Sequence, residues 1–110
     1  MQVEYYCDHR GRYPVFDYIH NLSSEIELNQ ITTHLRELER QGYRLHRPMA
    51  AMLRDGIYEL RPGHNRILYG FVEGNIVLLH AFRKTRNNIH DRDIESLADP
   101  ADFTYSDGVV

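Results

Sequence analysis

Apolar residues recur at spacings of three and four between positions 25 and 41, and this periodicity predicts a long amphipathic helix. The apolar stripe consists of Leu28, Ile31, Leu35 and Leu38. Ser24, followed three residues later by Glu27, resembles a capping box that opens the helix, and Gly42 is well placed to end it. The stripe indicates one side of this helix that packs against the rest of the protein.

The residues before this helix predict a strand and then a shorter helix. The segment from Val3 to Cys7 is rich in residues that favour strands. Pro14 suits the start of a helix, and Ser23 and Ser24 interrupt the helical pattern again. The apolar side of the shorter helix consists of Val15, Phe16, Tyr18, Ile19 and Leu22.

Three short runs of β character follow the long helix, after a connecting stretch from Tyr43 to Met52. The runs are Ile57 to Arg61, Arg66 to Val72 and Asn75 to Phe82. The sequences Pro62–Asn65 and Glu73–Asn75 between them are typical of turns. Because such short connections join antiparallel neighbours, the runs predict a β-meander.

The chain after the meander predicts a short final helix from about His90 to Ala98 and an acidic tail at 99–110. The predicted fold class is α+β: a small antiparallel sheet of about four strands, with two N-terminal helices packed on one face and a short C-terminal helix. The length of 110 residues fits one domain, which we place at residues 1–98.

The charge is unevenly distributed, although the net charge is only −3. Between Arg44 and Arg86 there are eight basic and three acidic residues, which leaves a local excess of five positive charges. This basic middle is consistent with a surface that binds an anion such as a nucleic acid. The alternative is a set of solvated arginines at strand ends.

Period-two alternation places Glu59, Arg61 and Arg66 together on the sheet face opposite the helices, which we expect to be open. A surface ion pair with no further role accounts for such a group, because surface pairs are common and individually weak. The functional alternative is that Arg61 and Arg66 clamp a phosphate and stabilise charge that builds up in a transition state.

Further candidate residues follow the last strand. Lys84 lies on the loop there, flanked by Arg83 and Arg86, and loops at sheet ends often carry functional groups. His90 has a side chain suited to proton transfer, or it simply begins the final helix. His80 faces either the core or the open side of the sheet.

Several classes of protein are not indicated. The seven histidines show no spacing typical of a metal site, and no nucleotide-binding or hydrolase motif is present, so we expect no metal and no cofactor. Cys7 is the only cysteine, which excludes an internal disulfide and suits a reducing compartment. Without an apolar run of about 20 residues or the features of a signal peptide, we expect no membrane association and a cytoplasmic location.

Three segments together resemble the RelE/ParE toxin superfamily, and most closely its HigB-like, phage Gp49-like branch. They are Leu53-Arg54-Asp55-Gly56-Ile57-Tyr58-Glu59-Leu60-Arg61, Asn65-Arg66-Ile67-Leu68-Tyr69 and Val77-Leu78-Leu79-His80-Ala81-Phe82-Arg83-Lys84-Thr85. The order of the predicted elements agrees as well, so the resemblance covers nearly the whole chain. Thr85 departs from the pattern, because the branch usually has a second lysine there.

The resemblance implies a toxin that enters the ribosomal A site, cleaves mRNA and is neutralised by a small helix-turn-helix antitoxin. By position, Arg66 matches the family's arginine that contacts the scissile phosphate, and Arg61 matches the arginine of its Leu-Arg pair. Lys84 and His90 fall at or near catalytic positions of the family. The catalytic set implied is therefore Arg61, Arg66, Lys84 and His90, and the set implied to bind RNA is Arg54, Arg83 and Arg86.

The chemistry implied is attack of an RNA 2′-hydroxyl on the neighbouring phosphate, with His90 as the acid and Glu59 or His80 as the base. Arginine titrates too high to serve as a base. Two other functions share this fold: a ParE-like toxin that inhibits DNA gyrase, and an inactive relative that only binds an antitoxin.

Overall fold

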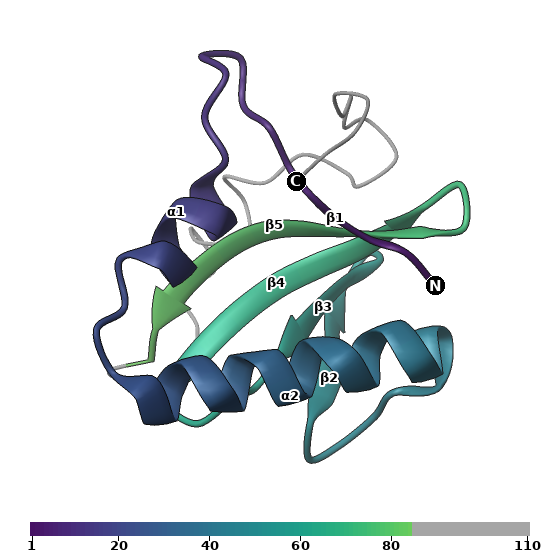
Figure 1. The fold of residues 1–110 in the computed structure, drawn as a ribbon. Coiled ribbons are helices and arrows are strands. Elements are labelled where there is room, and N and C mark those ends of the chain that lie inside the picture. The colour runs from purple at the N-terminus through teal and green to yellow at the C-terminus, as the bar shows by residue number, and fades with distance from the viewer. Residues whose placement is uncertain (85–110) are drawn as a thin grey trace.

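The computed structural model describes residues 1–84, which form two helices, one 3₁₀ turn and five strands (Figure 1). In chain order the elements are β1 (Val3–Tyr5), α1 (Pro14–His20), α2 (Glu25–Gln41), η1 (Gly42–Arg44), β2 (Ala50–Arg54), β3 (Ile57–Leu60), β4 (Asn65–Val72) and β5 (Asn75–Arg83). The predicted α+β class is confirmed. The predicted C-terminal helix and acidic tail lie outside the described residues.

The sheet contains five strands in the order β1-β5-β4-β3-β2, so the expectation of about four strands was wrong. The predicted meander is confirmed as β3, β4 and β5, which pair antiparallel, and β1 pairs with β5 in parallel. A parallel neighbour requires a crossover connection. Here the chain leaves β1, forms both helices and returns to the sheet at β2.

The additional strand is β2, which ends the stretch predicted to be a connection. It pairs antiparallel with β3 through a two-residue turn at Asp55 and Gly56. Both residues have positive φ angles, 49° and 79°, as the tight turn of a β-hairpin requires. The Asp-Gly pair is therefore the sequence feature that could have indicated β2.

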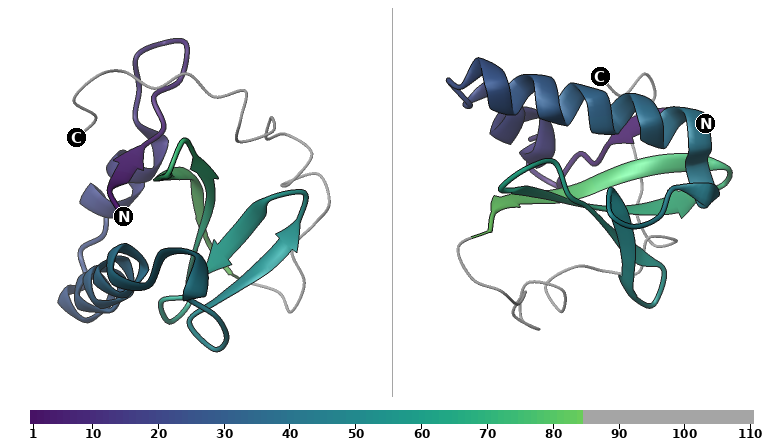
Figure 2. Two further views of the ribbon diagram at one scale, coloured as in Figure 1. Left: turned by 90° about the vertical axis from the view of Figure 1, so that its right-hand side faces the viewer. Right: turned by 90° about the horizontal axis from the view of Figure 1, so that it is seen from below.

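Both helices lie against the same face of the sheet, as predicted (Figures 1 and 2). Val15 of α1 and two residues of the α2 stripe, Ile31 and Leu38, are at most 1% exposed. They form one core with inward-facing strand residues. The buried strand residues of this core are Ala50, Leu60, Ile67, Tyr69, Ile76 and Leu78.

The ends of α2 are set by the residues that the sequence indicated. The Ser24 hydroxyl accepts a hydrogen bond from the Glu27 amide at 3.2 Å, and the Gly42 amide donates to the carbonyl of Leu38. In a capping box the Glu27 carboxylate would bond back to the Ser24 amide. Here the carboxylate points toward the sheet instead and accepts hydrogen bonds from Asn65 and Arg83.

Candidate functional site

The sheet face opposite the helices carries two adjacent rows of side chains from three strands. In one row Glu59 of β3 lies opposite Leu68 of β4, which lies opposite His80 of β5. In the next row Arg66 lies opposite Phe82. The rings of His80 and Phe82 stack with their centroids 5.6 Å apart, so His80 belongs to this face and not to the main core.

The carboxylate of Glu59 holds the two predicted arginines together. Arg61 Nε donates to Glu59 Oε1 at 2.7 Å, and Arg66 Nε lies 3.9 Å from the same oxygen. The prediction that Glu59, Arg61 and Arg66 are neighbours is thus confirmed.

The expectation that this face is open was wrong at its centre, because Glu59 is only 2% exposed. Beside it, Ile57 and Leu68 form a second small hydrophobic cluster against the partly buried Leu53 and Phe82. Apolar side chains on this face therefore remove the carboxylate from water. A buried carboxylate requires compensating positive charge, which Arg61 and Arg66 supply.

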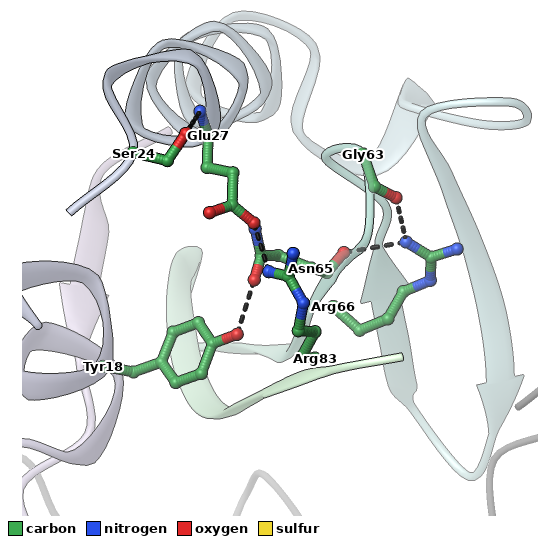
Figure 3. Close-up of polar contacts among 7 residues, drawn as sticks. All are labelled: Tyr18, Ser24, Glu27, Gly63, Asn65, Arg66 and Arg83. Atoms are coloured by element: carbon green, nitrogen blue, oxygen red, sulfur yellow. Dashed lines mark hydrogen bonds and ion pairs between the residues drawn. The ribbon is translucent and has the colours of Figure 1, made fainter. Parts of the chain in front are cut away.

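The guanidinium of Arg66 is fixed against the β3–β4 turn (Figure 3). Its Nη1 donates to the main-chain carbonyls of Gly63 at 2.6 Å and Asn65 at 2.8 Å. The side chain is 13% exposed. Burial lowers the pKa of Arg66 from its ordinary value, and the nearby Glu59 carboxylate acts in the opposite direction. An arginine begins from so high a pKa that it stays protonated at neutral pH.

Two buried polar atoms in this cluster lack a hydrogen-bond partner among residues 1–84: Glu59 Oε2 and Arg66 Nε. One is an acceptor and the other a donor. Buried polar groups are usually satisfied, because leaving one unpaired costs roughly 1–3 kcal/mol. The cluster therefore has unused capacity both to accept and to donate a hydrogen bond.

Lys84 lies next to the same turn, because its amide donates to the carbonyl of His64 at 2.8 Å. It follows the end of β5 directly, two positions after Phe82. Arg54 ends β2 beside the Asp55–Gly56 turn, which is the end of β3 remote from Arg61. Arg86 and His90 lie outside the described residues.

Arg83 lies on the opposite face, toward the helices (Figure 3). Its guanidinium forms an ion pair with the Glu27 carboxylate of α2. Of the candidate arginines, Arg83 is therefore separated by the sheet from Arg61 and Arg66.

Glu27 also contacts a buried amide that sequence reasoning did not single out. Asn65 is 0% exposed, and its Nδ2 donates to Glu27 Oε1 at 3.2 Å. Its Oδ1 accepts a 2.5 Å hydrogen bond from the Tyr18 hydroxyl of α1. The sequence predicts a turn at Asn65, a helix cap at Glu27 and an apolar helix surface at Tyr18. Nothing in their local sequence indicates that the three meet.

Two features are absent from the part of the chain that the structure describes. Among residues 1–84 no group of three or more His, Cys, Asp or Glu side chains is arranged to hold a metal ion. In the same part of the chain, no helix is both long and apolar enough to cross a membrane.

The contacts of Glu27 predict how stability responds to pH. Hydrogen bonds from Arg83 first, and then Asn65, lower the pKa of Glu27 below its usual 4.5. A carboxyl whose pKa is lowered by folding stabilises the protein above its unfolded pKa, and that stability is lost as pH falls through the folded pKa. The wild type should therefore lose more free energy of unfolding than Glu27→Gln between about pH 6 and about pH 3.

Urea unfolding at several pH values measures this difference. Glu25→Gln serves as the matched control, since Glu25 is an exposed residue in the same turn of α2. Equal pH dependence in wild type and Glu27→Gln would contradict the prediction.

Comparison with known protein families gives a match. The model of the family described as phage derived protein Gp49-like (DUF891) matches residues 17–99, which is about three quarters of the chain. No curated protein sequence matches the chain. The family match spans α2, the 3₁₀ turn, the four strands β2 to β5 and all of Glu59, Arg61, Arg66 and Lys84. The chain thus belongs to the phage Gp49-like family, which is part of the RelE/HigB toxin superfamily.

Proposed function

We propose that this protein is the toxin of a type II toxin–antitoxin system and cleaves mRNA held in the ribosomal A site. Membership of the Gp49-like family suggests a toxin of the RelE/HigB type. The observation that carries the nuclease proposal is the cluster on the helix-free face. Two guanidiniums converge there on one buried carboxylate, and a donor and an acceptor are left unpaired.

The convergence of two arginines on one carboxylate favours a binding site over a purely structural ion pair. Replacing a buried ion pair by apolar residues is often neutral or stabilising, so stability alone is a weak reason to keep one. The partly exposed guanidiniums of Arg61 and Arg66 suit RNA, because they can donate hydrogen bonds to phosphate oxygens.

The proposed reaction is an in-line displacement within the RNA. The 2′-oxygen attacks the adjacent phosphorus while the bond from phosphorus to the 5′-oxygen breaks. A base takes the proton of the 2′-hydroxyl, and an acid gives a proton to the leaving 5′-oxygen. The products are a 2′,3′-cyclic phosphate and a 5′-hydroxyl. No outside co-reactant is needed.

In this mechanism Arg61, Arg66 and Lys84 neutralise charge on the phosphate oxygens. Electrostatic stabilisation of this kind is usually the largest catalytic contribution. The ribosome would hold the message in place, and orientation alone can remove several kcal/mol of a barrier. A small set of catalytic side chains is then sufficient.

The proton transfers are assigned by accessibility. Glu59 is 2% exposed and already accepts a hydrogen bond from Arg61, which favours a role in arranging the arginines. His80 lies in the same row as Glu59 and is partly exposed, which favours it as the base. His90 is proposed as the acid, and Arg54, Arg83 and Arg86 as further contacts to RNA, of which Arg83 would first have to leave Glu27.

The proposed partners follow from the same assignment. The toxin family implies an antitoxin, and we propose a small helix-turn-helix protein. The substrate would be met on the ribosome, in the cytoplasm.

Expression in bacteria tests the nuclease proposal. Induction of the wild type should arrest growth and create new mRNA 5′ ends inside translated frames. Arg66→Ala combined with Lys84→Ala should abolish both effects, because the phosphate then loses two cations. Arg40→Ala is the matched control, since that arginine lies on α2 and, within residues 1–84, pairs with its neighbour Glu37.

The outcomes separate the alternatives. Growth arrest without new mRNA ends would contradict the nuclease proposal and point to another target such as DNA gyrase. Absence of arrest from folded protein would indicate a relative that only binds an antitoxin.

Glu59→Gln and His80→Gln should separate structural from catalytic roles. Glu59→Gln leaves two largely buried guanidiniums without their counter-charge, so we expect a loss of about 1–3 kcal/mol in free energy of unfolding. His80→Gln should change stability little and lower the cleavage rate on the order of 10²-fold, the usual contribution of a general base. Urea unfolding and RNA cleavage by the purified proteins measure the two effects. A stable, inactive Glu59→Gln beside an active His80→Gln would reverse the assignment.

A further inference from the structure

Asn65 occupies a position shared by the structural core and the candidate site. Its amide contacts both helices on one side of the sheet, and the next residue, Arg66, directs its guanidinium to the other side (Figure 3). Asn65 is fully buried, at 0% exposure. A buried amide that makes specific hydrogen bonds has one favoured orientation, because any other would leave polar atoms unpaired.

Every polar group of Asn65 is engaged. The side chain bonds to Tyr18 and Glu27, and the main-chain amide donates to the carbonyl of Pro62 at 3.1 Å. The main-chain carbonyl accepts from Arg66 Nη1 at 2.8 Å. The side chain and the main chain are therefore held from opposite sides, and the direction of this carbonyl is determined by both.

The same region also sets the end of β5. Asn65 pairs with Arg83 in the β4–β5 register, and Arg83 forms its ion pair with Glu27. Lys84 follows directly and is bonded through its amide to His64. Two of the cations proposed to meet the phosphate, Arg66 and Lys84, thus adjoin residues that the Asn65–Glu27 contacts hold in place.

We propose that Asn65 is a positioning residue for phosphate recognition: its buried side chain, held by Tyr18 and Glu27, orients one of the two carbonyls that align the Arg66 guanidinium. This inference rests on the proposed nuclease function and deepens it. Asn65 does not contact the RNA in this account and acts through Arg66. The two helices accordingly contribute to the site although they lie on the other face of the sheet.

The simplest competing account is that Asn65 only stabilises the fold. Both accounts expect Asn65→Ala to lower the free energy of unfolding, since buried partners lose their hydrogen bonds. They differ in kinetics. A positioning residue that acts through Arg66 should lose its effect when residue 66 no longer carries a forked guanidinium, whereas a structural loss should be independent of residue 66.

A double-mutant cycle tests this difference. Wild type, Asn65→Ala, Arg66→Lys and the double variant are assayed by single-turnover cleavage of a defined mRNA on programmed ribosomes. We expect Asn65→Ala to lower the rate at saturation on the order of 10²-fold, as misplacement of a catalytic group by about 1 Å can do. The substrate concentration at half-maximal rate should stay within about twofold. In the Arg66→Lys background, removing Asn65 should change the rate by less than about threefold.

Two further variants separate a positioning effect from a loss of stability. Tyr18→Phe removes one hydroxyl from the Asn65 contacts and should give a smaller defect of the same kind. Ile76→Val, a change in the buried core at the end of β5 remote from Arg83, lowers stability away from this network and should leave the rate unchanged.

The outcomes are distinct. Equal rate losses from Asn65→Ala in both backgrounds, or a matching loss in Ile76→Val, would overturn the positioning role while leaving the nuclease proposal intact. An inactive wild type would overturn the nuclease proposal, and the positioning role with it.

Discussion

The hydrogen bonds of the buried Asn65 amide are the constraint on which this structure most depends. Tyr18 of α1 and Glu27 of α2 both bond to that amide, so the helices are joined to the sheet by specific polar contacts as well as by the apolar core. Apolar packing tolerates sliding of one layer over another more easily than buried hydrogen bonds do, since a shift leaves polar groups unpaired. The register between the helix layer and β4 is thereby determined, and the residue that follows in β4 is Arg66.

The two faces of the sheet carry different groups of residues. The face under the helices contains the main core, whereas the opposite face collects Glu59, Arg61 and Arg66 beside a smaller apolar cluster. That cluster removes Glu59 from water, and the reduced hydration strengthens its interaction with the arginines. The fold itself is compatible with a nuclease, a gyrase inhibitor or a binding protein, because function depends on the site. The two guanidiniums that converge on Glu59 are what favour the nuclease.

Local patterns predicted the parts of this structure that local interactions determine. The period of α2, its cap at Ser24, the meander and the grouping of Arg61 with Arg66 all followed from spacing and alternation. The parallel pairing of β1 did not, because it depends on a crossover between segments far apart in the chain. β2 was missed although the Asp-Gly turn marks it. The Asn65 contacts were not predictable, since its partners lie 38 and 47 positions away and each has an adequate local explanation.

The chemistry of the cleaved ends tests the central claim most directly. Purified protein is incubated with programmed ribosomes that carry an mRNA, and the new ends are identified by enzymatic end-group analysis. The account predicts a 2′,3′-cyclic phosphate (or the 3′-phosphate formed from it) on one fragment and a 5′-hydroxyl on the other. It also predicts no cleavage when the attacking 2′-hydroxyl is replaced by hydrogen. Intact mRNA, or fragments with 5′-phosphate and 3′-hydroxyl ends, would contradict it.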